Sequence, residues 1–111
     1  MKTFLIAPAR GHAPDKWRAL VEKLENAGFK VHWPARDTDQ SCPTGLAICR
    51  QNLAAIENAD CVHVAWDGAS QGCLFDLGMA FALEKPVRVV EMPAPTEGKS
   101  FQNMVRAWSA A

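Results

Sequence analysis

One stretch in the second half of the chain holds most of the residue types that could do chemistry. It runs from Asp67 to Asp76 and places Ser70 and Gly72 between two carboxylates. Gly72 begins an apolar segment of helical length, so free backbone N–H groups and the positive end of a helix dipole are expected beside the Ser70 hydroxyl. Such a pocket suits a phosphate or a sugar oxygen.

The Asp76 carboxylate lies about one turn further into the same predicted helix. Burying it without a partner would cost on the order of several kcal/mol, so we expect it to face a cleft or to meet a partner. The alternative is a structural role, in which Asp76 satisfies backbone donors near the start of the helix.

A second candidate segment follows the first apolar run and extends from Ala7 to His12. Arg10 supplies a permanent cation beside Gly11, whose backbone can approach a ligand closely. His12 has an ordinary pKa that suits an acid or a base. The segment is interpreted as an anion or sugar contact, and a solvated turn is the alternative because the pattern is short and common.

The elements that must position these residues alternate along the chain. Short apolar runs predict strands over 3–7, 29–33, 61–66 and 87–92. Helical patterns follow each of them: one from Asp15 to Gly28, one with Leu46, Cys49, Leu53 and Ile56 facing inward, one over 72–83, and one starting at Ser100. The helix over 72–83 is apolar almost all round, which predicts burial against a sheet, and 33–44 and 93–99 are predicted as loops.

This alternation predicts one α/β domain over residues 1–111. Short connections imply right-handed crossovers and a flavodoxin-like, doubly wound parallel sheet of four strands in the order 2-1-3-4, in three layers. Ligands in such sheets bind where the strand order reverses. The loops after Ala7 and after Trp66 should therefore face each other across the cleft.

The composition argues against several classes of function. Lysine plus arginine and aspartate plus glutamate both number 12, so no net field draws the protein onto nucleic acid or an anionic membrane. The four cysteines form no Cys-x-x-Cys pair, and we expect no metal site and no cofactor. The first apolar run stops at Pro8, too early for a signal peptide or a membrane span, which favours a cytoplasmic protein.

Three segments together have the pattern of a known family: Phe4-Leu5-Ile6-Ala7-Pro8-Ala9-Arg10-Gly11, then Ala59-Asp60 before a strand, then Ser70-x-Gly72-x-x-x-Asp76-Leu77-Gly78. Through them the chain, from Lys2 to about Val90, resembles the nucleoside 2-deoxyribosyltransferase superfamily. The similarity is greater to its branch of 2′-deoxynucleoside 5′-phosphate N-hydrolases.

The resemblance implies a small nucleoside or nucleotide substrate and a retaining mechanism through a carboxylate nucleophile. Asp76 matches the nucleophile, and Ser70 matches a serine that holds the 5′-phosphate. Ala7, Arg10, Gly11, His12, Asp67 and Gly72 fall in the segments that line the same pocket. The resemblance also implies a homodimer or higher homo-oligomer, with the helix after Ser100 against a neighbouring subunit.

Three positions depart from the pattern of this family. Asp76 stands where glutamate is usual, Asn52 where an aspartate assists the leaving base, and Phe4 where a tyrosine orients the nucleophile. These departures support the alternative of a nucleotide sensor that binds without catalysis, since an amide cannot deliver a proton. A third class, a flavin or protein-interaction domain using Trp33 and Trp66, lacks a serine- and threonine-rich loop after the first strand, and a bound flavin would colour the protein yellow.

Overall fold

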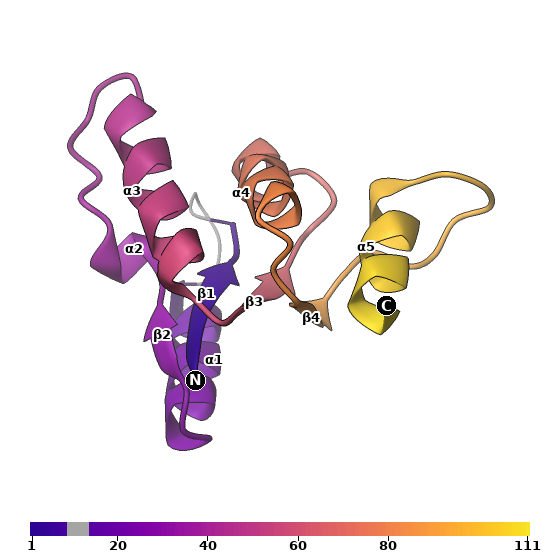
Figure 1. Ribbon diagram of the computed structural model, residues 1–111, viewed down its shortest axis with the longest axis horizontal. Coiled ribbons are helices and arrows are strands. Elements are labelled where there is room, and N and C mark those ends of the chain that lie inside the picture. The colour runs from indigo at the N-terminus through magenta and orange to yellow at the C-terminus, as the bar shows by residue number, and fades with distance from the viewer. Residues whose placement is uncertain (9–13) are drawn as a thin grey trace.

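Four short strands form one parallel sheet in the order β2-β1-β3-β4 (Figure 1). The computed structural model describes residues 1–8 and 14–111. Its strands are β1 (Lys2–Ile6), β2 (Lys30–His32), β3 (Cys61–Ala65) and β4 (Val87–Glu91). Its helices are α1 (Pro14–Asn26), α2 (Pro34–Asp37), α3 (Leu46–Asn58), α4 (Gln71–Ala82) and α5 (Phe101–Ala110).

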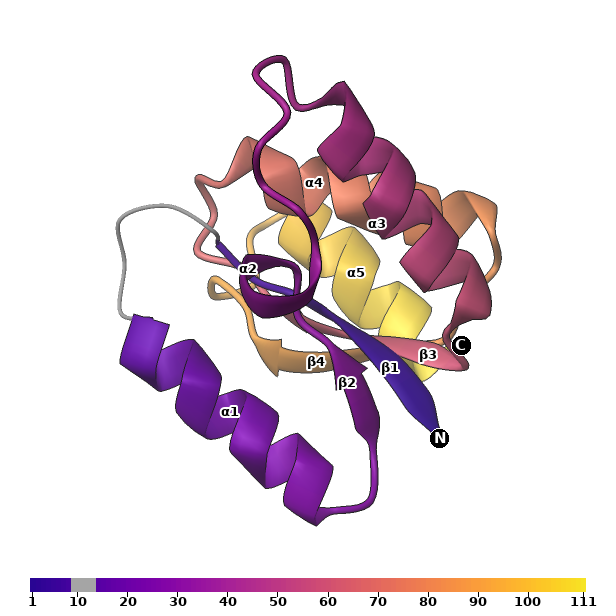
Figure 2. The same ribbon diagram turned by 90° about the vertical axis from the view of Figure 1, so that its left-hand side faces the viewer.

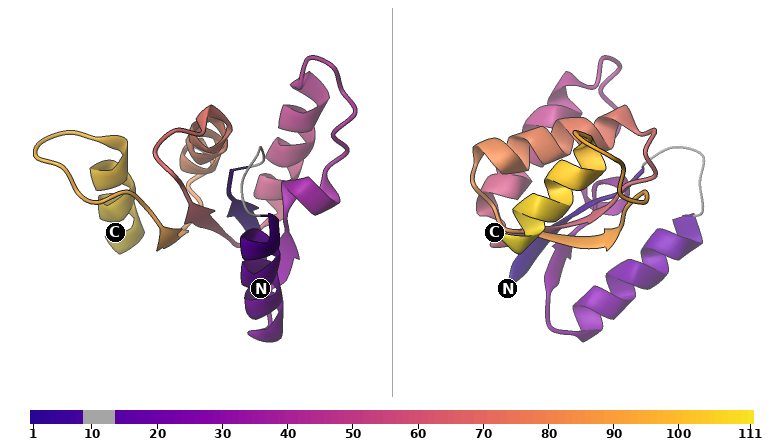
Figure 3. Two further views of the ribbon diagram at one scale, coloured as in Figure 1. Left: turned by 180° about the vertical axis from the view of Figure 1, so that it is seen from behind. Right: turned by 90° about the vertical axis from the view of Figure 1, so that its right-hand side faces the viewer.

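Helices cover both faces of this sheet, which gives three layers. Successive side chains of a strand point to opposite faces, and β1 contributes alternately to two cores. Leu5 packs with Trp17 and Val21 of α1 on one face. Phe4 and Ile6 pack on the other face against residues of α3, α4 and α5. Figures 2 and 3 show α1 alone on its side of the sheet and the three other long helices together on the opposite side.

The strand order reverses beside β1, as the sequence predicts. β1 pairs in parallel with β2 on one side and with β3 on the other, and β4 pairs with the far edge of β3. The carboxyl ends of β1 and β3 therefore lie next to each other, and the loops that leave them border a cleft. The predicted flavodoxin-like α/β fold with its 2-1-3-4 order is confirmed.

Two helices differ in detail from the predictions. The helix predicted over 72–83, which is α4, packs against the sheet as expected, but its apolar residues are not all covered, since the side chains of Phe75 and Phe81 are both 57% exposed. Only one stripe of α4 is buried, because a single sheet face and the flanking helices cannot surround it. A short helix, α2, also begins at Pro34 inside the segment predicted as a loop, since proline suits a first helical turn.

The inward face of α3 is also rotated from the predicted one. Leu46 is 54% exposed, whereas Asn52 and Ile56, four residues apart, are the two residues of α3 that are buried. The prediction followed the apolar residues of the helix and missed a polar residue on its buried stripe. That polar residue borders the cleft described below.

Within the described ranges, 1–8 and 14–111, every helix falls short of the length and apolar character that crossing a membrane requires.

Candidate active site

A cleft of about 570 Å³ opens at the carboxyl ends of β1 and β3. Its walls come from the end of β1, the chain between β2 and α3, one side of α3, and the first two turns of α4. Six of the residues singled out in the sequence line it: Ala7, Asn52, Asp67, Ser70, Gly72 and Asp76. The tertiary structure thus brings α3 and α4 to opposite sides of one cavity, with a carboxylate and an amide between them.

Asp76 and Asn52 interact directly across this cleft. The Asn52 side chain is 5% exposed and its amide hydrogen-bonds to the Asp76 carboxyl group. Burial raises the pKa of Asp76 to about 6, and the hydrogen bond from Asn52 acts in the opposite direction by favouring the ionised form. The partner expected for Asp76 is therefore Asn52. Near neutral pH the carboxyl is largely ionised but only modestly solvated, which suits a nucleophile.

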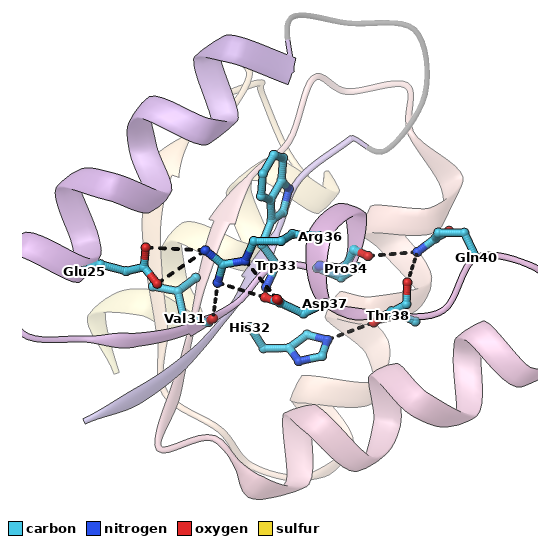
Figure 4. A network of polar contacts seen from close by, with 9 residues as sticks. All are labelled: Glu25, Val31, His32, Trp33, Pro34, Arg36, Asp37, Thr38 and Gln40. Carbon is cyan, nitrogen blue, oxygen red and sulfur yellow. Dashed lines mark hydrogen bonds and ion pairs between the residues drawn. The ribbon is translucent and has the colours of Figure 1, made fainter.

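Asn52 is in turn held by Thr38, which itself contacts His32, and sequence reasoning missed both of these side chains. The Thr38 hydroxyl donates to Asn52 Oδ1 at 2.8 Å, and His32 Nε2 lies 2.8 Å from Thr38 Oγ1. Figure 4 shows the His32 ring directed at Thr38. Thr38 directly follows α2, and a single threonine at such a position belongs to no motif that could have signalled this contact.

The first turn of α4 forms the opposite wall. Ser70 is its N-cap, and Ser70 Oγ accepts from the Cys73 N–H at 3.3 Å. Asp67 Oδ1 accepts from the N–H groups of Ala69 and Ser70 at 2.9 and 2.8 Å, which fixes the turn that leads into the helix. Because Ser70 Oγ accepts in this cap, its hydroxyl hydrogen remains able to donate to a ligand.

Gly72 keeps this wall open. A Cβ atom added there would lie 3.9 Å from Ser70 Oγ, an ordinary contact distance, so the glycine is not required for packing. A larger side chain would instead occupy the part of the cleft beside the Ser70 hydroxyl. The N–H groups of Gln71 and Gly72, the first two of α4, lack intrahelical acceptors and belong to residues that line the same cleft.

Two aromatic residues considered in the sequence lie elsewhere. Phe4 is fully buried in the core and stacks on His32, with ring centroids 5.3 Å apart and an interplanar angle of 9°. Trp66 is 6% exposed, donates from Nε1 to the Ser70 carbonyl, and meets Phe101 edge-on. Both side chains support the cleft from beneath, so neither offers a face on which a base could stack.

The predicted contacts Arg10, Gly11 and His12 lie outside the described residues. Among the residues that the structure does describe, no lysine or arginine lines the cleft. The described part also contains no group of three or more histidine, cysteine, aspartate or glutamate side chains placed to hold a metal ion. Further lining residues, which no motif predicted, are Gln40, Ile48, Cys49 and Phe75.

Fold and cleft together define a class. The protein is a flavodoxin-like α/β protein in which a carboxylate, hydrogen-bonded to a side-chain amide, lies where the strand order of the sheet reverses. The nucleoside 2-deoxyribosyltransferase family model matches residues 4–105, and the chain belongs to that family. This membership confirms the resemblance to the nucleoside 2-deoxyribosyltransferase superfamily, whose members act at the N-glycosidic bond of nucleosides.

Two solved structures share the fold. The 2-deoxyribosyltransferase of Bacillus psychrosaccharolyticus superposes with a TM-score of 0.70 at 21% identity, over 95% of this chain and 80% of that one. The CMP N-glycosidase of Clostridium botulinum superposes with a TM-score of 0.68 at 18% identity, over 99% of this chain and 81% of that one. No curated protein sequence matches the chain significantly.

Proposed function

We propose that the protein is an enzyme that releases the base from a nucleoside 5′-monophosphate, with Asp76 as the nucleophile. The observation that carries this proposal is the cleft itself, which is lined both by a half-buried carboxyl group with a pKa of about 6 and by the N-terminus of α4. The carboxylate can attack the sugar as a nucleophile, and the helix N-terminus can bind the 5′-phosphate of the substrate.

The reaction follows a double displacement. One Asp76 oxygen bonds to C1′ of the sugar as the C1′–N bond breaks, and the electron pair leaves with the base, which takes a proton from water. Water then bonds to C1′ and loses a proton, and the C1′–O bond to Asp76 breaks. Asn52 stabilises the free carboxylate by hydrogen bonding but supplies no proton, since an amide is not an acid at neutral pH.

The other wall of the cleft supports the choice of a phosphorylated substrate. The Ser70 hydroxyl and the first N–H groups of α4 can donate to phosphate oxygens, and the positive end of the helix favours their charge. Arg10 adds a cation in this proposal. The resemblance of the sequence to the 5′-phosphate N-hydrolase branch supports this assignment, as does the CMP N-glycosidase among the similar structures. Transfer to a second base is the alternative second step.

Base release from a panel of ribo- and deoxyribonucleosides and their 5′-monophosphates, followed by chromatography, tests the proposal. We expect free base with one or more monophosphates, and its loss in Asp76→Ala. Asp15→Ala, which changes an exposed aspartate of α1 across the sheet, is the matched control and should retain activity. The absence of base from every substrate, together with saturable nucleotide binding by calorimetry, would instead identify a sensor.

A further inference from the structure

The donors and acceptors in the hydrogen bonds among His32, Thr38 and Asn52 can be assigned in only one way. Thr38 has a single hydroxyl hydrogen and gives it to Asn52 Oδ1, so Thr38 Oγ1 must accept from His32 Nε2. Since Oδ1 is occupied by this donor, the NH₂ group of Asn52 is the end that points to Asp76. A reversed amide would place its oxygen against the carboxylate and leave the Thr38 hydroxyl facing a second donor.

His32 is itself held so that it can donate. Its ring lies flat against Phe4, which fixes the ring plane, and burial lowers the pKa of His32 while the neighbouring Asp37 raises it and Arg36 lowers it. The neutral ring carries one N–H, and its place on Nε2 follows from the Thr38 contact. Phe4 therefore acts on this cleft through His32, although its ring does not line the cavity.

We propose that Thr38 is a positioning residue for the Asp76 nucleophile. Thr38 acts through the Asn52 amide, and the Nε2–H of His32 orients the Thr38 hydroxyl by donating to it. This inference rests on the proposed function and extends it to residues outside the cleft. In this proposal the Asn52 donor orients the Asp76 carboxylate toward C1′ of the sugar. An aspartate is one methylene shorter than a glutamate, so the orientation of its carboxylate has a larger effect on how closely it approaches C1′. A misplacement of about 1 Å can cost on the order of a hundredfold in rate.

Replacing the threonine tests this arrangement. Thr38→Val keeps the shape of the side chain but removes the hydroxyl, so Asn52 loses the donor that fixes the orientation of its amide. The kcat for base release should then fall on the order of ten- to a hundredfold, with KM changed less than about twofold. Thr38→Ser keeps the hydroxyl and should restore most of kcat. His32→Phe keeps the stack on Phe4 without the Nε2 donor and should lower kcat in the same direction.

The chain offers a matched control for the loss of a buried hydrogen bond. Thr3 Oγ1 and His63 Nδ1 form a second threonine–histidine contact at 2.6 Å, and both residues are 5% exposed or less. Thr3→Val should therefore destabilise the fold to a similar degree and leave kcat unchanged. Equal losses of kcat in Thr3→Val and Thr38→Val, or no rescue by Thr38→Ser, would overturn the proposal.

A second readout separates this proposal from the proposed function. Carbon-13 NMR titration of the Asp76 carboxyl group needs no turnover. In Thr38→Val the pKa of Asp76 should rise above that of the wild type by about 0.5 or more, because the anion loses an oriented donor, with no change in Thr3→Val. If the wild-type protein releases no base but this shift appears, the positioning role stands and the enzymatic assignment fails. An unchanged Asp76 pKa in Thr38→Val overturns the positioning role, whatever the activity.

Discussion

Asp76 of α4 and Asn52 of α3 hydrogen-bond across the cleft at the carboxyl end of the sheet. The contact joins two helices that are separated by β3 in the chain. One partner is a carboxyl group whose pKa is raised by burial, and the other is a neutral amide whose orientation is fixed by Thr38. The chemistry assigned to the cleft depends on this pair, and the pair has consequences for both rate and stability.

The rate of base release should depend on the ionisation of Asp76. Only the carboxylate is nucleophilic, and its pKa is about 6, so kcat/KM should rise with pH through about 6 and level off above 7. Asn52→Leu removes the donor that favours the anion, and its profile should move to higher pH. Initial rates between pH 4.5 and 8.5 measure both curves. A profile that falls over this range in the wild type would contradict the role of Asp76.

The free energy of unfolding should also depend on the ionisation of Asp76 and should decrease as pH rises. The pKa of Asp76 is about 6 in the folded protein against an ordinary value of 3.8, so the folded state binds this proton more tightly than the unfolded chain. Stability from the protonated carboxyl is therefore fully present below about pH 4 and is lost as pH rises through about 6, by on the order of 3 kcal/mol.

The variant Asp76→Asn has no titratable group at this position, so a comparison with it isolates the contribution of the Asp76 carboxyl group to the pH dependence of stability. Urea unfolding of both proteins at pH 4 and pH 7 should show the wild type losing on the order of 3 kcal/mol relative to the variant between the two pH values. All other titrating groups are common to both proteins and cancel in the comparison. A constant difference in unfolding free energy would mean that Asp76 titrates at its ordinary value.

Two serines allow phosphate binding to be separated from helix capping. Ser70 caps α4 at the cleft, and Ser100 caps α5 by accepting from the Asn103 N–H at 3.1 Å. Replacing either with alanine should cost about 1 kcal/mol of stability. Only Ser70→Ala should also raise KM for a 5′-monophosphate, by about tenfold, because it alone removes a donor to the phosphate. Steady-state kinetics decide this, and a similar KM in both variants would place the phosphate elsewhere.

The cysteines should differ sharply in reactivity. Cys42 precedes α3, where hydrogen bonds from the Ala47 N–H and from Thr44 lower the pKa of its thiol to about 7. Burial raises the pKa of the Cys73 thiol to about 11. Iodoacetamide at pH 7.5 should alkylate Cys42 first and Cys73 only after unfolding, as mass spectrometry of peptides would show. Cys42→Ser is the control, and early labelling at Cys73 would contradict the burial described.

The sequence predicted the fold because the signals for it are local. Continuous apolar runs, the start of the last helix at Ser100, and strict alternation of elements favour the sheet order 2-1-3-4. The position of the cleft follows from that order, and so does the approach of Asp67, Ser70 and Asp76 to the end of β1. These residues are adjacent in the chain or on one helix, so spacing alone brings them together.

What the sequence could not supply is the partner of Asp76 and the side chains behind that partner. Asn52 lies on the buried stripe of α3, but a polar residue among apolar ones carries no sign of the direction it faces until α3 is packed against α4. Thr38 reaches Asn52 from the segment after α2, and His32 of β2 contacts Thr38. Both hydrogen bonds depend on the sheet, which fixes β2 beside β1. Residue types and local spacing set the fold class and place Asp76 at the cleft, and the family resemblance suggests its role as nucleophile. The environment of its carboxylate is decided by contacts between distant segments.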